Sequence, residues 1–414
     1  GGGRSGADSA ADSDTRRVIA TRANPNPDIQ PSGVATRSPS AGLPATPSEP
    51  PAPAQTPVPT PASVPSQAPI PTQAPIPTPA PTPLPQPPPP PPPQLAPIRA
   101  YYYLWWSQQH WTEKLGPNYP YTASPWPLPA TADADGCNPV SLYSGNQLLD
   151  VPPTLLDQDA SGVIEADILL ARSAGLTGFL LSWGGNGSAG QQIGDVTYTR
   201  RLNEAFAASN RVGGVSHWIS YKASSMPSPA FIIGDLTFLA NAFAGQPSWE
   251  HRDGKPVLVL TGSRNYGDAD LATITGAVRD RFYLVGDESY QTLTPARLAM
   301  FDALTYYWST QDPWGNPASF TRIAEMGAMV HAAGKPWIAP FAAGYDSVLL
   351  GGSTCVPRRG GETMRALFHG NAVSAPDGWA LISWNEIAEN SHIQPLTRWG
   401  DAYLRMVGDL ARGS

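Results

Sequence analysis

Beyond residue 97, short and nearly continuous apolar runs alternate with longer segments of helical periodicity. Apolar runs without polar alternation are expected of strands that are buried on both faces. These runs predict eight strands, at Arg99–Trp106, Leu176–Trp183, Val215–Tyr221, Pro256–Thr261, Phe282–Gly286, Ala303–Trp308, Pro336–Phe341 and Trp379–Trp384. The segments between and after them predict helices at Gly162–Ala174, Pro229–Ala244, Asp268–Arg279, Pro295–Phe301, Pro317–Ala333 and Thr397–Leu410. This alternation is typical of an α/β fold, the (β/α)8 TIM barrel, here over residues 98–414. A doubly wound open sheet is disfavoured because no Gly-x-Gly-x-x-Gly turn follows any strand.

Residues 1–97 have the composition of a linker. Of the 49 prolines in the chain, 29 precede Ile98, and no aromatic residue precedes Tyr101. With so few large apolar side chains, this segment cannot offset the entropy that folding costs. We therefore expect a disordered, polar and Pro-rich tether whose proline tracts favour the extended polyproline II helix. Such tethers are common in exported proteins, so we expect an extracellular or cell-surface location, although a trimmed cytoplasmic protein would have the same pattern.

Composition and charge exclude several classes of protein. The net charge is −7 and there is no basic patch, which argues against nucleic-acid binding. The longest apolar runs, of about seven residues, are too short to span a membrane. Two cysteines, Cys137 and Cys355, are too few for a disulfide-dense scaffold or a four-cysteine zinc site. They form either one disulfide, which an exported location favours, or two separate thiols. No His-x-x-x-His pair occurs, so we expect no metal site. We also expect that the protein needs no cofactor and is a monomer.

Aromatic and polar residues gather at the predicted carboxyl ends of the strands and just beyond them. In a TIM barrel these ends share one face, where active sites lie, and the long connections 107–161 and 342–377 belong to the same face. Aromatic rings suit the apolar face of a pyranose, and the polar side chains suit its hydroxyls. The candidates for substrate binding are Tyr103, Trp106, His110, Trp111, Trp183, His217, Tyr221 and Trp384. Core packing is the alternative interpretation of each single tryptophan, but the whole set indicates a carbohydrate cleft.

The strongest local signal is the pair Glu386 and Glu389, which follows the last predicted strand. Two carboxylates at i and i+3 point the same way where the chain turns helically. Crowded carboxylates repel each other, so the pKa of one rises and that group stays protonated. Hydrolysis of a glycosidic bond requires one general acid and one general base. Glu-x-x-Glu pairs are common on exposed helices, and it is the position behind the apolar run Trp379–Trp384 that makes this pair a catalytic candidate.

Six motifs in order along the chain form a recognisable series. They are Tyr101–Trp106 with His110-Trp111, Gly175–Gly185, His217–Tyr221, Asp253–Val257, Gly344–Asp346 with Arg358–Gly361, and Asn385–Asn390. Together they resemble glycoside hydrolase family 99, the endo-α-mannosidase and endo-α-mannanase family, and the wider group of family-99-like domains. The last motif is similar to the closing Asn-Glu-Trp-x-Glu-Gly of that family. The resemblance runs through most of residues 98–407.

The resemblance implies a retaining, endo-acting glycoside hydrolase on an α-linked polysaccharide, with no cofactor. It implies that Glu386 is the base on the 2-hydroxyl of the sugar, that an epoxide-like intermediate forms, and that Glu389 is the general acid/base. Asn385, Tyr345 and His217 are implied as hydrogen-bonding or orienting partners.

The chain departs from the family at three positions. Ile387, Asn390 and Ile219 stand where the family has Trp, Gly and Glu, and the last of these lines the sugar site in the family. Family-99-like domains keep the two-Glu motif, often near polysaccharide-synthesis proteins. The alternative is therefore a non-catalytic polysaccharide-binding or cell-surface polysaccharide-assembly protein on the same barrel.

Overall fold

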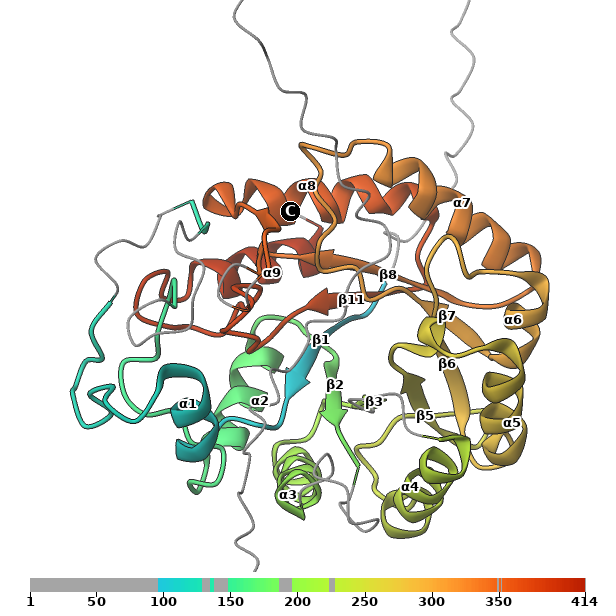
Figure 1. The fold of residues 1–414 in the computed structure, drawn as a ribbon, viewed down its shortest axis with the longest axis horizontal. Coiled ribbons are helices and arrows are strands. Elements are labelled where there is room, and N and C mark those ends of the chain that lie inside the picture. Colours follow the sequence, from blue (N-terminus) through green and yellow to red (C-terminus); the bar gives the residue numbers. More distant parts are fainter. Residues whose placement is uncertain are drawn as a thin grey trace, which may run out of the picture. The chain divides into compact units, whose positions relative to one another are not determined.

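The predicted strands close into a barrel (Figure 1). The computed structural model describes residues 96–128, 135–137, 148–185, 196–222, 228–347, 350 and 352–413. The barrel strands are β1 (Ile98–Tyr103), β2 (Gly178–Trp183), β3 (Trp218–Tyr221), β5 (Lys255–Leu260), β6 (Tyr283–Asp287), β7 (Ala303–Thr305), β8 (Trp337–Ala342) and β11 (Gly378–Ile382). Each pairs in parallel with the next, and β11 pairs with β1 through Trp379 opposite Ile98. The expected (β/α)8 TIM barrel is confirmed.

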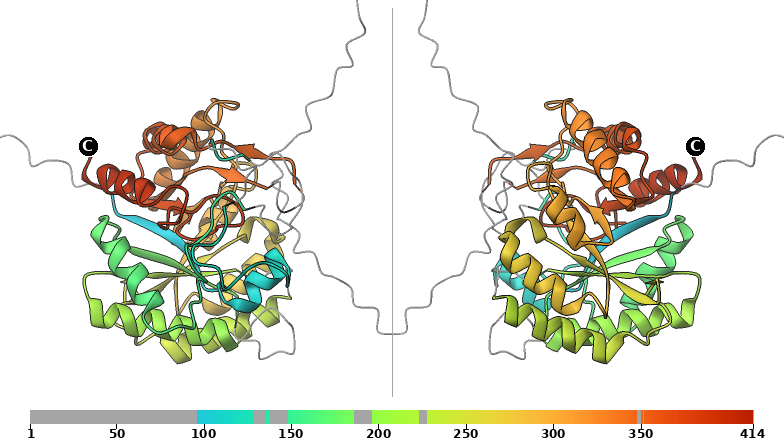
Figure 2. Two further views of the ribbon diagram at one scale, coloured as in Figure 1. Left: turned by 90° about the vertical axis from the view of Figure 1, so that its left-hand side faces the viewer. Right: turned by 90° about the vertical axis from the view of Figure 1, so that its right-hand side faces the viewer.

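Helices cover the outside of the barrel in both side views (Figure 2). After successive strands they are α2 (Val163–Ser173), α3 (Val196–Val212), α4 (Pro229–Phe243), α5 (Asp268–Val278), α6 (Pro295–Met300), α7 (Ser319–Ala332), α8 (Glu362–Asn371) and α9 (Ala402–Arg412). Every residue of β1, β2, β8 and β11 is buried. This burial on both faces explains why the strands have continuous apolar sequences.

The long connections carry smaller elements. Helix α1 (Gln108–Leu115) follows β1, and its connection buries a second apolar cluster around Trp106, Trp111 and Trp126. Strand β4 (His251–Arg252) forms a hairpin with β5, while β9 (Tyr345–Asp346) pairs with β10 (Cys355–Val356) after β8. Single 3-10 turns lie at Ser263–Asn265, Arg359–Gly361 and Ala372–Ser374.

Several sequence-based boundaries are wrong. Strands β1 and β7 end at Tyr103 and Thr305, so Trp106 and Trp308 lie in loops. The last helix begins at Ala402 rather than Thr397, because the chain first makes a turn in which the Gly400 amide donates to the Leu396 carbonyl.

Helices α1, α3 and α8 are absent from the sequence-based prediction. For α3 the signal was available, since Leu202, Ala205 and Phe206 repeat at helical spacing and are all buried. Of the predicted tether, residues 1–95 lie outside the described residues. Within the described part of the chain, no helix is long and apolar enough to cross a lipid bilayer.

Candidate active site

Glu386 and Glu389 lie in the turn after β11, at the carboxyl end of the last barrel strand. The Glu386 amide donates to Ser383 Oγ at 2.8 Å, which fixes the start of the turn. The Glu389 carbonyl accepts a hydrogen bond from the Asp346 amide of β9 at 2.8 Å. Glu386 is buried and Glu389 is half-buried. Strands β11 and β9 therefore hold both carboxyl-bearing residues at one rim of the barrel.

Asn385 joins this turn to the end of β1. Its Oδ1 accepts from the Tyr103 amide at 2.8 Å, and its Nδ2 donates to the Tyr103 carbonyl at 2.9 Å. The Asn385 carbonyl accepts from the Trp106 indole at 2.7 Å. An amide side chain offers a donor and an acceptor together, so it satisfies both backbone groups of Tyr103. Because Asn385 is fully buried, it positions the turn rather than contacting a sugar.

The two carboxyls interact electrostatically. Burial, and after it the charge of Glu389, raises the pKa of Glu386 to about 8. Burial also raises the pKa of Glu389. The charges of Lys114 and Lys222 lower both pKa values in part. The pair therefore retains a proton at pH values where ordinary carboxyls are ionised, and it titrates as a unit.

Three tyrosines, Tyr103, Tyr307 and Tyr345, lie within the field of the two carboxyls. Burial raises the pKa of each, and the charges of Glu386 and Glu389 raise it further. The hydroxyls of Tyr103 and Tyr307 are 2.7 Å apart, within hydrogen-bonding distance. These phenols stay protonated, and because one of the Tyr103 and Tyr307 hydroxyls donates to the other, one proton of that pair is left to donate to an oxygen atom in the site. The structure thus brings the predicted Tyr103 and Tyr345 to the carboxyls and adds Tyr307.

Trp105 and Lys222 line the same region. The half-buried Trp105 ring stacks on Tyr103 with centroids 4.3 Å apart. The Lys222 ammonium lies 5.6 Å from the Tyr103 ring centroid and 5.9 Å from that of Trp105. Trp105, Lys222 and Tyr307 are absent from the sequence-based candidates, although Trp105 and Tyr307 are the penultimate residues of predicted strands and Lys222 directly follows one.

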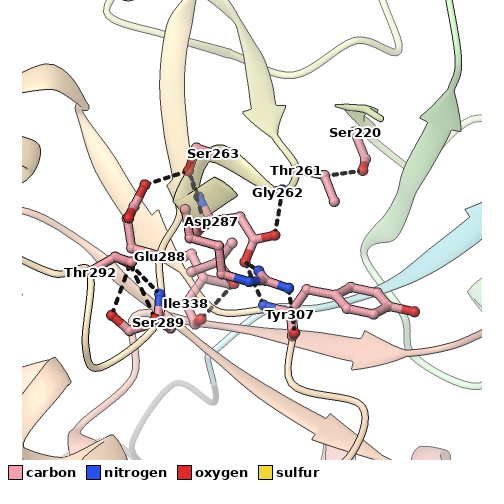
Figure 3. A network of polar contacts seen from close by, with 12 residues as sticks. Ser220, Thr261, Gly262, Ser263, Asp287, Glu288, Ser289, Thr292, Tyr307 and Ile338 are labelled. Atoms are coloured by element: carbon pink, nitrogen blue, oxygen red, sulfur yellow. Dashed lines mark hydrogen bonds and ion pairs between the residues drawn. The ribbon is translucent and has the colours of Figure 1, made fainter. Parts of the chain in front are cut away.

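A buried network supports the backbone of Tyr307 (Figure 3). Asp287 ends β6, accepts from the Tyr307 amide at 2.8 Å and pairs with Arg264 at 2.5 Å. The adjacent Glu288 pairs with Arg297 at 2.9 Å. An arginine balances each buried carboxylate, as buried charges require. These acids stabilise the loops around the rim and leave Glu386 and Glu389 as the candidate reacting pair.

His217 and Trp384, both predicted to bind substrate, lie between the barrel and its helices. The His217 ring contacts Ser209 Oγ of α3 at 2.5 Å and accepts from the Phe179 amide at 2.9 Å. Burial, with the Arg99 charge, lowers the pKa of His217 to about 3, so the ring is neutral. Trp384 is fully buried and packs edge-on against Phe179 at 5.2 Å. Neither side chain reaches the carboxyl pair, which corrects the sequence-based expectation.

Trp183 and Tyr221 also point toward helices. The Trp183 indole donates to Thr199 of α3 at 3.2 Å, and the Tyr221 hydroxyl donates to Asp235 of α4 at 3.0 Å. Successive residues of a strand alternate between its two faces. A residue at the carboxyl end of a barrel strand is therefore as often directed outward as into the site, and these two are outward.

Trp106 and Trp111 lie beneath the turn that carries the glutamates. They stack with centroids 4.2 Å apart and are fully buried in the cluster formed by the α1 connection. Their burial leaves no ring face for a sugar. His110 is half-buried and stacks on Trp105 at 5.4 Å, so it alone of these three predicted residues borders the site.

The three departures from the family motif have structural explanations. Ile387 faces the apolar cluster of the α1 connection, where any large apolar side chain serves. Asn390 has φ +50°, in the left-handed region that Gly adopts freely and that Asn tolerates best among other residues. Ile219 of β3 faces outward, as do Tyr221 of the same strand and His217 just before it. The neighbouring inward position belongs to Ser220, whose hydroxyl lies 2.5 Å from that of Thr261.

The turn is also held from behind. Fully buried Arg358 donates to the Asn390 side-chain oxygen at 3.1 Å and to the Asn390 carbonyl at 3.0 Å. The Asn390 amide group donates to the Gly136 carbonyl at 2.7 Å. The next residue, Cys137, forms a disulfide with Cys355, so that expectation is confirmed. In the described part of the chain, no three His, Cys, Asp or Glu side chains converge to hold a metal ion.

The chain matches solved structures but no known sequence family. No protein-family model and no curated protein sequence matches the chain. Two solved structures of the GH99 endo-α-mannosidase from Bacteroides thetaiotaomicron match with TM-scores of 0.58 and 0.57, the first in complex with BIS-TRIS propane. Both are 17% identical, and the matches cover 76% and 77% of this chain and 97% and 98% of theirs.

The barrel is similar in fold to a glycoside hydrolase family 99 enzyme. A glycoside hydrolase-like protein also matches, with a TM-score of 0.50 and 16% identity over 70% of this chain and 97% of its own. At such identities the likeness concerns the fold, and a fold alone does not determine an activity.

Proposed function

We propose that this protein is a retaining, endo-acting glycoside hydrolase that cleaves an α-linked polysaccharide of the mannan type without a cofactor. The observation that carries the proposal is the pair Glu386 and Glu389, whose pKa values are both raised by burial, that of Glu386 also by the charge of Glu389. The pair lies at the carboxyl face of the barrel, where TIM-barrel enzymes place their chemistry. Tyrosine hydroxyls and two lysines beside the pair suit an oxygen-rich substrate.

In the proposed first step, the Glu386 carboxylate removes the proton of the sugar 2-hydroxyl. The 2-oxygen attacks the anomeric carbon, and the bond from that carbon to the leaving oxygen breaks. Glu389 gives its proton to the leaving oxygen, so the departing sugar is neutral. The product of this step is an epoxide-like sugar, with Glu386 protonated and Glu389 ionised.

In the second step, ionised Glu389 takes a proton from water while the water oxygen attacks the anomeric carbon. The bond to the 2-oxygen breaks, and Glu386 returns its proton to that oxygen. Two inversions at the same carbon give net retention, and both glutamates regain their starting states.

Substrate binding has to place the shared proton on Glu389. In the protein alone, the charge of Glu389 raises the pKa of Glu386, which favours the proton on Glu386. A 2-hydroxyl that donates to Glu386 stabilises its carboxylate form, because hydrogen bonds to a charged group favour that form. A leaving oxygen that accepts from Glu389 favours its protonated form. The substrate thereby selects the reactive arrangement of a single proton.

The test is a turnover screen of the full chain against α-mannans, α-glucans and bacterial exopolysaccharides. We expect oligosaccharide release from at least one polymer, with the new reducing end initially in the α configuration by ¹H NMR. Glu386→Gln and Glu389→Gln should each reduce release by about 10³-fold or more. Release that persists in both variants would contradict the roles of the pair. Polysaccharide binding without release, equal in all three proteins, would favour the non-catalytic binding protein.

We further propose that the protein is exported or tethered at the cell surface. The Cys137–Cys355 disulfide supports this location, since disulfides persist in oxidising compartments and are rare in the reducing cytosol. Fractionation of the source cells followed by immunodetection tests the proposal, and a purely cytosolic signal would contradict it.

A further inference from the structure

Trp314 is an exposed aromatic residue on the rim that carries the carboxyl pair. It lies in the connection from β7 to α7, and its side chain is 41% exposed. Connections from strand to helix gather at the carboxyl face of the barrel, where Glu386 and Glu389 also lie. Single exposed apolar residues are common on protein surfaces, but an exposed ring at the face of the candidate site is a candidate for ligand binding.

The Trp314 ring is held in place by hydrogen bonds. Its indole nitrogen donates to Thr363 Oγ1 of α8 at 3.0 Å, and its backbone amide donates to Asp312 Oδ1 at 2.9 Å. Thr363 in turn donates to the Pro357 carbonyl at 2.5 Å. Two neighbouring connections of the barrel, after β7 and after β8, therefore position one ring. A ring fixed in this way loses little conformational freedom when a ligand stacks on it.

The base of the loop is also rigid. Gln311 and Asn371 exchange two amide hydrogen bonds, of 2.9 Å and 2.8 Å, and both side chains are buried. Gln311 also donates to Ser319 Oγ at 3.1 Å. A buried and satisfied polar pair of this kind specifies one loop conformation.

An arginine completes the arrangement. The Arg359 guanidinium carbon lies 4.7 Å from the centroid of the Trp314 ring, so it covers one face and the exposed area belongs to the rest of the ring. Arg359 itself has φ +47°, and Gly360 and Gly361 continue in the left-handed region. Non-glycine residues in this region are uncommon and cluster at binding sites. The exposed guanidinium places hydrogen-bond donors beside an apolar surface, which is the combination that a pyranose requires.

The Trp314–Arg359 pair is connected to the catalytic turn. Arg359 follows Arg358, whose guanidinium bonds to Asn390, the neighbour of Glu389. The link from the ring to the proposed acid/base residue thus runs through Arg359, Arg358 and Asn390. We propose that Trp314 and Arg359 form a secondary subsite that binds a pyranose unit of the polysaccharide away from the bond being cleaved. This inference rests on the proposed function, and it explains how the enzyme would hold a long polymer.

The test compares Trp314→Ala, Trp314→Phe and Arg359→Ala with the wild type, as full chains. Tyr290→Ala is the matched control, since Tyr290 is 36% exposed in the preceding strand-to-helix connection, after β6. On the polymer cleaved by the wild type, we expect Trp314→Ala to raise KM by roughly fivefold to tenfold, with kcat nearly unchanged. On a short oligosaccharide both constants should stay near the wild-type values. Trp314→Phe should recover most of the affinity, because it keeps an aromatic face.

A binding assay separates this proposal from the proposed catalytic function. In a native gel that contains a polysaccharide, a protein that binds the polysaccharide migrates more slowly, whether or not it cleaves it. Retardation of the wild type that weakens in Trp314→Ala but not in Tyr290→Ala would support the subsite even if no polymer is cleaved. Equal retardation of all variants, or an equal rise of KM on short and long substrates, would overturn it. Loss of turnover in Glu389→Gln with full retardation would test the catalytic pair independently.

Discussion

Replacing Glu386 by glutamine removes a buried charge and keeps the shape of the side chain. The native pKa of Glu386 is raised from 4.5 to about 8 by burial and the Glu389 charge. At low pH the raised pKa does not change the free energy of unfolding, because the folded and unfolded states both hold the proton. Between the two pKa values the unfolded state releases its proton and the folded state does not. The free energy of unfolding therefore falls as the pH rises through this range.

The magnitude follows from the two pKa values. The difference between 4.5 and about 8 corresponds to about 5 kcal/mol above pH 8, at 1.36 kcal/mol for each pH unit. The two carboxyls titrate as a unit, so part of this energy belongs to Glu389. We expect Glu386→Gln to stabilise the protein by about 2–5 kcal/mol at alkaline pH and by little near pH 4.

Urea unfolding of the disulfide-intact protein at about four pH values between 4 and 9 measures this effect. The exposed Asp280→Asn is the matched control, and its unfolding energy should stay parallel to that of the wild type. A difference between Glu386→Gln and the wild type that is constant from pH 4 to pH 9 would contradict this prediction. It would mean that the Glu386 carboxyl has no raised pKa in the folded protein.

Further predictions address the neighbouring groups. Lys222→Met removes a charge that lowers both glutamate pKa values, so the pH–rate profile should move to higher pH by about 0.5; an unmoved profile would contradict this. Asn385→Ala removes the side-chain acceptor of the Tyr103 amide and one of the two donors to the Tyr103 carbonyl, which keeps its bond from Gln158, so it should cost about 1–3 kcal/mol in urea unfolding; a change under about 0.5 kcal/mol would argue against this role of Asn385. Cys355→Ser opens a link between residues separated by 218 positions and should lower the free energy of unfolding by about 4–5 kcal/mol, with no further effect of reductant. His217→Ala should lower thermal stability but leave polysaccharide affinity unchanged, because the ring bonds to Ser209 and Phe179; weakened binding would restore its predicted role.

The barrel and the candidate reacting pair could both be predicted from the sequence. Near-continuous apolar runs such as Leu176–Trp183 can be buried only between an interior and a helical layer, and their alternation with helices leaves few topologies. Glu386 and Glu389 were identified because they follow the last of these runs and because the motif that contains them resembles family 99. Both signals are local, so they can be read without knowledge of distant contacts.

Which side chains lie beside the pair could not be predicted from the sequence, because it depends on how the strands pair in the barrel. A strand end carries inward and outward residues in alternation, and the inward phase depends on register with neighbouring strands. Tyr103 and Tyr307 come together from β1 and from the loop after β7, while His217, Trp183, Tyr221 and Trp384 contact helices or the core. In the sequence these residues are equal candidates, since each combines a ring with a polar group that could bind a sugar. Their role depends on contacts between residues far apart in the chain, and those exist only after the barrel closes.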